Sequence, residues 1–172
     1  GLFATLILND STVSDNTSGI RNDGNLTLTR STVSGNRVNQ AGVNSGGIFN
    51  TGTMTLSNST VSGNSAPGFG GGIHNTYGSE STIIDSIVSS NTAGNGGGGI
   101  SNYGGHLTIT NSTLSSNSAR DGGGVYNFDS QLTITNSTLS SNTASNQGGG
   151  IYNYAPLTLT HVTLSGNSAP EG

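Results

Sequence analysis

Thr113-Leu114-Ser115-Ser116-Asn117 contains a pattern that occurs seven times in this chain: an aliphatic residue followed three positions later by asparagine. The aliphatic members recur at intervals of 20 to 28 residues, at Val13, Val33, Val61, Val88, Leu114, Leu139 and Leu164. Self-similarity at such a period is typical of a solenoid, in which each repeat builds one turn. The repeat therefore predicts the architecture before any single residue predicts a function.

The composition fits a coil better than a globule. Only 29% of the 172 residues are hydrophobic and 7% are charged, and Gly, Ser, Thr and Asn are abundant. A solenoid needs few apolar residues, because each turn buries them against the turns on either side. The chain has no cysteine, so a disulfide framework is excluded.

Each repeat contains three arcs with the pattern of short strands. The first arc reads Gly-Gly-(Ile/Val)-x-Asn, as at 98–102, and the third reads Ser-Thr-(Val/Leu)-Ser. The second alternates strictly, as in Leu107-Thr108-Ile109-Thr110, which predicts aliphatic residues inside and threonines outside. We expect the joints between the third and first arcs to form corners and to carry the length variation, the longest joint spanning 37–45.

Stacked turns place equivalent residues about 4.8 Å apart, so each column of the repeat forms a ladder. Two columns consist of asparagine, whose amide can donate on one side and accept on the other. We expect both ladders to be structural. Their members are Asn16, Asn36, Asn64, Asn91, Asn117, Asn142 and Asn167 in one column and Asn22, Asn50, Asn75, Asn102, Asn127 and Asn153 in the other.

The motif Gly-Gly-Ile-x-Asn followed by Leu-Thr-Ile-Thr-Asn-Ser-Thr-Leu-Ser-Ser-Asn resembles the right-handed parallel β-helix repeats of large bacterial surface and secreted proteins, with the pectin-lyase-like fold. It is also similar to the GGAI and FxxN repeats of chlamydial polymorphic outer-membrane proteins, with Val or Leu in place of Phe. The resemblance implies an all-β, right-handed parallel β-helix of about six to seven turns and an extracellular or cell-surface location in a bacterium. It does not imply one activity, because this fold hosts lyases, hydrolases, adhesins and stalks.

Charge and hydropathy exclude several partners. The formal net charge is −4, there is no lysine and the four arginines are scattered, which disfavours nucleic acid and anionic membrane. No apolar run approaches the ~18 residues of a membrane span, so we expect no membrane insertion. The chain begins with Gly1, not Met, and we expect a single solenoid domain over 1–172 that is a processed chain or a segment of a longer protein.

The residue pattern does not indicate a catalytic site or a metal site. Asp10 and Asp85 share a column but lie three turns apart, about 14 Å, which is too far for paired carboxylates. His74, His106 and His161 fall in three different columns, and we expect His74 to point outward into solvent. We therefore expect no catalytic residues, no metal, no cofactor and no enzymatic activity.

Aromatic residues gather at equivalent positions in successive repeats. Tyr103, Phe128 and Tyr154 follow the first-arc asparagine, and Tyr126 and Tyr152 precede it. These five predict a stacked aromatic patch on one side of the C-terminal half. Such a patch binds sugar rings, for example cell-surface glycans, or another protein, or it clamps a corner of the fold.

Three functions remain open, in order of preference. The first is a structural or adhesive rod; the second is a carbohydrate-active domain of the pectin-lyase type or a carbohydrate-binding domain; the third is an ice-binding face. The third rests on Thr-x-Thr pairs such as Thr108/Thr110, whose array is interrupted by Ile7 and Ile84.

The two ends of the chain also nearly match within the repeat. Gly1 takes the place of Asn127 and Gly172 the place of Gly122, which leaves four repeat positions between them. We expect copies of the chain to stack head to tail into a filament, with 2–8 of one copy against the last turn of the next. A segment of one longer solenoid would show the same registration.

Overall fold

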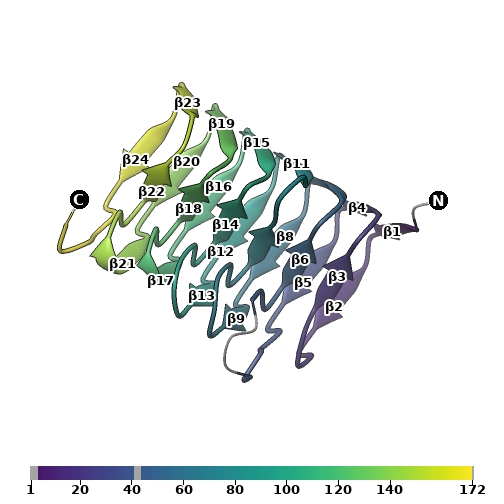
Figure 1. Ribbon diagram of the computed structural model, residues 1–172. Helices are drawn as coiled ribbons and strands as arrows, with labels where there is room; N and C mark the ends of the chain where they lie inside the picture. Colours follow the sequence, from purple (N-terminus) through teal and green to yellow (C-terminus); the bar gives the residue numbers. More distant parts are fainter. Residues whose placement is uncertain (1–3, 41–43, 172) are drawn as a thin grey trace.

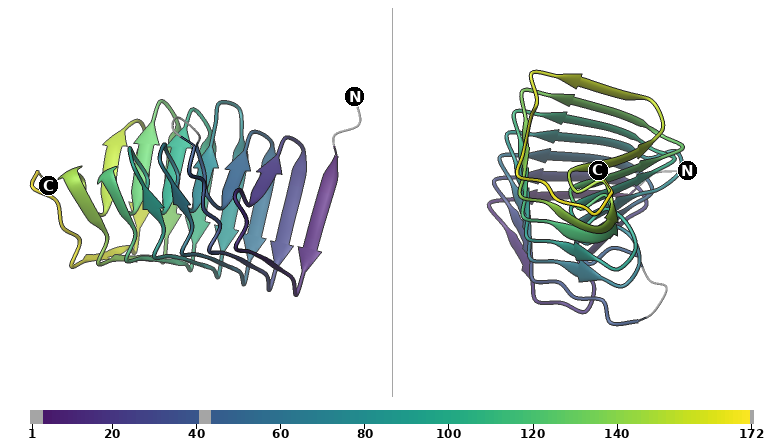
Figure 2. Two further views of the ribbon diagram at one scale, coloured as in Figure 1. Left: turned by 90° about the horizontal axis from the view of Figure 1, so that it is seen from below. Right: turned by 90° about the vertical axis from the view of Figure 1, so that its left-hand side faces the viewer.

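The computed structural model describes residues 4–40 and 44–171. The chain winds as a coil in which each strand pairs in parallel with the equivalent strand one turn earlier and one turn later (Figure 1). The turns follow one another along a single axis, so the first strand and the last strand lie at opposite ends of the coil (Figures 1 and 2). Gly1, Leu2 and Gly172, on which the predicted match of the ends depends, lie outside the described residues.

Sheets A, B and C correspond to the second, third and first arcs of the repeat. Sheet A contains β1 (Thr5–Asn9), β4 (Asn25–Thr29), β7 (Thr53–Ser57), β11 (Glu80–Ile84), β15 (His106–Thr110), β19 (Gln131–Thr135) and β23 (Leu157–Thr160). Sheet B contains β2 (Thr12–Ser14), β5 (Thr32–Ser34), β8 (Thr60–Ser62), β12 (Ile87–Ser89), β16 (Thr113–Ser115), β20 (Thr138–Ser140) and β24 (Thr163–Ser165). Sheet C contains β3 (Ile20–Asn22), β6 (Ile48–Asn50), β10 (Ile73–Asn75), β14 (Ile100–Tyr103), β18 (Val125–Phe128) and β22 (Ile151–Tyr154).

The joints are more regular than the sequence predicts. They form a fourth sheet, sheet D, with strands β9 (Ser65–Ala66), β13 (Thr92–Ala93), β17 (Ser118–Asp121) and β21 (Thr143–Gln147). A column of alanines gives this sheet its inner side; Ala66, Ala93, Ala119 and Ala144 are all buried. Glycine and serine in the joints signal corners, but one small apolar residue per turn is enough for a short strand to pack inward.

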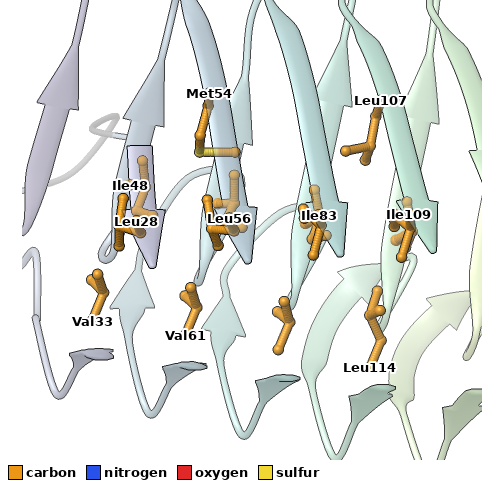
Figure 3. Packing of buried hydrophobic residues seen from close by; sticks show 14 of the residues in the cluster. Leu28, Val33, Ile48, Met54, Leu56, Val61, Ile83, Leu107, Ile109 and Leu114 are labelled. Carbon is orange, nitrogen blue, oxygen red and sulfur yellow. The ribbon is translucent and has the colours of Figure 1, made fainter. Parts of the chain in front are cut away.

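The core consists of aliphatic columns that run along the axis. Leu28, Leu56, Ile83 and Ile109 lie in one row, each fully buried (Figure 3). The alternating arc therefore has the predicted register: its aliphatic residues lie inside and their threonine neighbours on sheet A point outward. At the C-terminal end of the coil the column reaches Leu159, which is 41% exposed because no described turn covers it.

The bend from sheet A to sheet B is made by a single residue in the left-handed region. Its φ lies between 47° and 51° in every described turn, at Asp10, Arg30, Asn58, Asp85, Asn111, Asn136 and His161. Most L-residues avoid this region, whereas Asn and Asp adopt it more readily. This corner explains the Asn or Asp that follows most of the alternating arcs.

The Gly-Gly motif marks a close approach between two parts of each turn. A Cβ atom on Gly99 would lie 3.0 Å from Asn117 Nδ2 and 2.7 Å from the carbonyl oxygen of Gly124. The second glycine of the motif faces the asparagine ladder in the same way in other turns, for example Gly72 against Asn91. The second glycine of the motif is thus required by packing against the ladder, whereas a Cβ on the first, such as Gly98, would meet the carbonyl oxygen of Ser118.

Replacing Gly99 by alanine should destabilise the fold by about 1 to 3 kcal/mol, because the new methyl group would lie too close to the carbonyl oxygen of Gly124 and to Asn117 Nδ2. Urea unfolding followed by circular dichroism measures this, with Thr108→Ala on an exposed face as the control. An unchanged midpoint for Gly99→Ala would show that the contact tolerates a side chain.

Candidate functional site

Between its two terminal members, the first asparagine ladder uses both Nδ2 hydrogens of every side-chain amide. The backbone N–H and Nδ2 of Asn117 both donate to Asn142 Oδ1, at 3.0 and 2.9 Å. Nδ2 also donates to the carbonyl oxygen of Val88 at 3.0 Å, one turn back. Asn91 in turn donates to Asn117 Oδ1 at 3.0 Å from its backbone. The ladder runs in this direction from Asn16 to Asn167, which confirms the predicted ladder of hydrogen bonds.

This bonding pattern explains the spacing that reveals the repeat. The Asn of each turn donates to the carbonyl oxygen of the Val or Leu that lies three residues before the Asn of the preceding turn. The aliphatic side chain fills the core while its carbonyl group accepts this bond. The four-residue motif is therefore one unit of the ladder.

The second asparagine column is interrupted, although the alignment predicts it to be continuous. Asn22 donates to Asn50 and Asn50 to Asn75, and the column resumes from Asn102. Between these two runs, Asn75 Nδ2 and Asn102 Oδ1 have no hydrogen-bond partner. The break coincides with Ser81, which stands where the neighbouring strands carry Met54 and Leu107 and whose hydroxyl donates to Asn75 Oδ1 at 2.8 Å.

A serine ladder lies parallel to the asparagine ladders and was missed in the sequence. The backbone N–H of Ser112 donates to Ser137 Oγ at 3.0 Å, while the hydroxyl of Ser112 donates to the carbonyl oxygen of Thr110 at 2.7 Å. The sequence feature that indicates this ladder is the serine at the start of the third arc in most repeats. Its buried members are Ser31, Ser59, Ser86, Ser112 and Ser137.

One face of the coil carries the aromatic residues. The chain has four Phe and five Tyr, and Phe3 lies outside the described residues. The other eight, together with His74, form one connected network of ring contacts over sheet C and its adjoining loops. No Phe or Tyr belongs to the aliphatic core of the described residues.

Four of the five aromatic residues predicted from the repeat stack, and the fifth, Tyr154, contacts Phe128 and Tyr152 with its ring tilted. Tyr126 and Tyr152 lie 5.3 Å apart with ring planes 13° apart, and Tyr103 and Phe128 lie 5.1 Å apart at 15°. Rings at these separations overlap face to face with an offset, so they cover one another's faces. Tyr154 at the end of its column is 68% exposed. The predicted role of this patch in binding stays a prediction.

The network of ring contacts continues toward the N-terminal half through Phe69, whose position is not predicted by the repeat. Phe69, in the loop before β10, lies 5.4 Å from Tyr126 and 6.2 Å from His74. Ser101 lies between these two residues in sheet C, so Phe69 takes the place where that strand lacks a ring. Its loop position could not be deduced from the period of the strands.

His74 corrects an expectation. We predict it from the sequence to be solvated, but it is only 4% exposed, because Phe49 and Phe69 pack against it. Burial lowers the pKa of His74 to about 4, because the charged imidazolium is poorly solvated there. The alignment places His74 correctly on the outer face, but the loop that covers this face is an irregular feature.

The other candidate sites remain as scattered as the sequence indicates. Asp10 and Asp85 share a column three strands apart, and Asp10 pairs with Arg30 at 2.7 Å on the surface. Within residues 4–40 and 44–171, no group of three His, Asp or Glu side chains is placed to hold a metal ion. No helix in this part of the chain is long and apolar enough to cross a membrane.

The threonine array has the predicted register. One outward column of sheet A is threonine in six successive strands, from Thr27 to Thr158, and the next column is interrupted by Ser57 and Ile84. Its role in ice binding stays a prediction.

Asn117→Ala should destabilise the protein by about 1 to 3 kcal/mol, because Asn91 loses its acceptor and the carbonyl group of Val88 loses its donor. Asn95→Ala is the matched control, since Asn95 is exposed and its side chain makes no hydrogen bond to the described residues. Chemical denaturation of both variants measures the difference. Equal midpoints would contradict the structural role of the ladder.

Stability should also fall between pH 6.5 and pH 4 because of His74. Over this range the unfolded chain takes up a proton on His74 and the folded protein does not, so stability is lost as the pH falls, by up to about 3 kcal/mol. Denaturant unfolding at several pH values measures this slope. His74→Phe, which keeps a ring in the aromatic network, should have a flatter profile; identical profiles would refute the assignment.

Comparison with known proteins agrees with this geometry. Searches of curated proteins and of solved structures gave no significant match. A family model described as a right handed beta helix region matches residues 4–169. This match covers nearly the whole chain and agrees with the stacked parallel sheets, so the protein belongs to the right-handed β-helix family.

Proposed function

We propose that this protein is a structural β-solenoid of the bacterial cell exterior, a stiff rod whose turns continue end to end into a filament or an adhesive stalk. The directional asparagine ladder carries this proposal. Each Asn donates toward the C-terminal end and accepts from the N-terminal side, so the two ends of the coil differ and complement each other.

The ladder's terminal groups are suited to such a continuation. At the N-terminal end, Asn16 Oδ1 accepts no hydrogen bond from the described residues. At the C-terminal end, the backbone N–H of Asn167 has no acceptor among them. Stacking the C-terminal turn of one copy on the N-terminal turn of another would bring this donor to that acceptor.

The apolar columns support the same arrangement. Leu6 is 43% exposed at one end and Leu164 is 52% exposed at the other, whereas their column neighbours inside the coil are buried. In a stack, β1 and β2 of one copy would extend sheets A and B beyond β23 and β24 of the next. A heterologous contact of this kind does not close, and it therefore grows into a filament.

Catalysis is not part of the proposal. A glycosidase needs two carboxylates flanking one bond, roughly 5 to 10 Å apart. The aspartates that share a column, Asp10 and Asp85, are separated by three strand spacings, about 14 Å.

Head-to-tail assembly predicts that the particle mass of the purified chain rises with protein concentration. Static light scattering measures the mass, and negative-stain microscopy shows whether the particles are linear. Leu164→Lys should lower the mass at each concentration, because it places a charge in the apolar contact. Ile87→Lys is the matched control, since Ile87 is 46% exposed on a strand in the middle of sheet B.

The two variants separate end-to-end stacking from general stickiness. A parent protein that stays monomeric at every concentration would overturn the filament. Equal effects of Leu164→Lys and Ile87→Lys would mean that association occurs through the sides of the rod. Circular dichroism of both variants checks that the coil itself is retained.

A further inference from the structure

A hollow of about 340 Å³ lies on the outer face of sheet C. It lies between the column that contains Tyr103 and Phe128 and the column that contains His74 and Tyr126. It is large enough for a small molecule. Its lining consists of Asn44, Phe69, His74, Tyr103, Tyr126 and Phe128. None of these side chains is charged at neutral pH. The hollow is therefore an aromatic site with a few neutral polar groups.

Two buried polar atoms beside this hollow lack partners. His74 and Ser101 are paired in register on adjacent strands and are 4% and 0% exposed. Neither His74 Nδ1 nor Ser101 Oγ makes a hydrogen bond. Leaving such a group unpaired costs about 1 to 3 kcal/mol, and native proteins rarely do so without a reason. The fold does not require polar residues there, since Tyr126 and Tyr152 occupy the same column.

The Phe69 ring packs beside these residues, 6.2 Å from the His74 ring and 5.4 Å from the Tyr126 ring, and His74 and Tyr126 flank Ser101 in sheet C. The Phe69 backbone is held on both sides, because Ser45 N donates to Phe69 O at 2.8 Å and Gly70 N donates to Gly96 O at 2.9 Å. The ring itself reaches the column from a loop, so it is not fixed by the pleat of a strand. Rotation of this side chain would connect the hollow with the two unpaired atoms.

We propose that the hollow binds one residue of a neutral sugar, with the Phe69 ring turned aside and sugar hydroxyl groups bonded to His74 Nδ1 and Ser101 Oγ. A cyclic sugar has C–H groups on its faces and hydroxyl groups around its rim. The aromatic walls suit the faces and the unpaired atoms suit the rim. This site does not depend on end-to-end stacking, which involves other residues.

The surrounding charges favour a neutral sugar over an acidic one. Arg21 lies on the aromatic face, but its guanidinium lies 4.9 Å from the ring centroid of Phe49 and is paired with Asp23 at 2.9 Å. At the other side, Asp129 accepts a hydrogen bond from Tyr77. The low pKa of His74 keeps its imidazole uncharged at neutral pH. A bound carboxylate would therefore lack a counter-charge.

Nuclear magnetic resonance of the full chain with ¹⁵N-labelled histidine tests the site directly. The probes are D-glucose, D-galactose, N-acetyl-D-glucosamine and the acidic D-galacturonate. At least one neutral sugar should shift the ring signals of His74 and leave those of His106 and His161 in place, while galacturonate should shift none. A lack of response to all three neutral sugars, or an equal response to galacturonate, overturns the proposal.

Substitutions then identify the groups that bind. His74→Phe keeps the ring but removes the nitrogen, and Ser101→Ala removes the hydroxyl; each should weaken binding about tenfold, as expected for one hydrogen bond. Calorimetric titration with the sugar that shifts His74 measures this. Tyr154→Ala is the control on the same aromatic face but outside the hollow, and it should bind as the parent does. An equal loss of affinity in all three variants would place the sugar on the exposed aromatic rings outside the hollow and refute the proposal.

Discussion

Each inner turn of this protein is joined to its neighbours by an asparagine whose two amide hydrogens are both used, one toward the next turn and one back to the preceding turn. The rest of the turn is built around this requirement. A glycine must face the amide because a Cβ would collide with it, and the aliphatic residue three positions earlier must expose its carbonyl group toward the following turn. Buried amides are costly unless every hydrogen bond is made, so the columns tolerate little change in spacing.

The same constraint divides the residues between inside and outside. The cross-section leaves room for aliphatic columns and short polar ladders, so the buried core of the described residues contains Leu, Ile, Val and one Met. The aromatic rings instead lie on the outer face of sheet C, where they stack on one another and shield part of that face from water. The rod thus has one side that presents aromatic rings and one side that presents threonine hydroxyl and methyl groups.

The repeat is broken most clearly in two adjacent turns. Ser81 replaces a core aliphatic residue, Ser101 replaces an outer aromatic one, and the second asparagine ladder is interrupted between Asn75 and Asn102. Among the described residues, six buried side-chain atoms have no partner, and five of them belong to these turns, on His74, Asn75, Ser79, Ser101 and Asn102. Local rules that are violated together in an otherwise regular protein mark the place where function is to be sought.

The sequence alone determined the class of fold, the register of sheets A, B and C and the first asparagine ladder. In a periodic chain, equivalent residues meet the same neighbours in every turn and therefore adopt the same structure. It also placed Tyr126, Tyr152 and their neighbours on one face. Only the tertiary structure decided the fourth sheet, the break in the second ladder, the burial of His74 and the position of Phe69 against His74 and Tyr126. These features depend on an irregular loop meeting a strand one turn away, and such contacts are set by the packing of side chains that no period predicts.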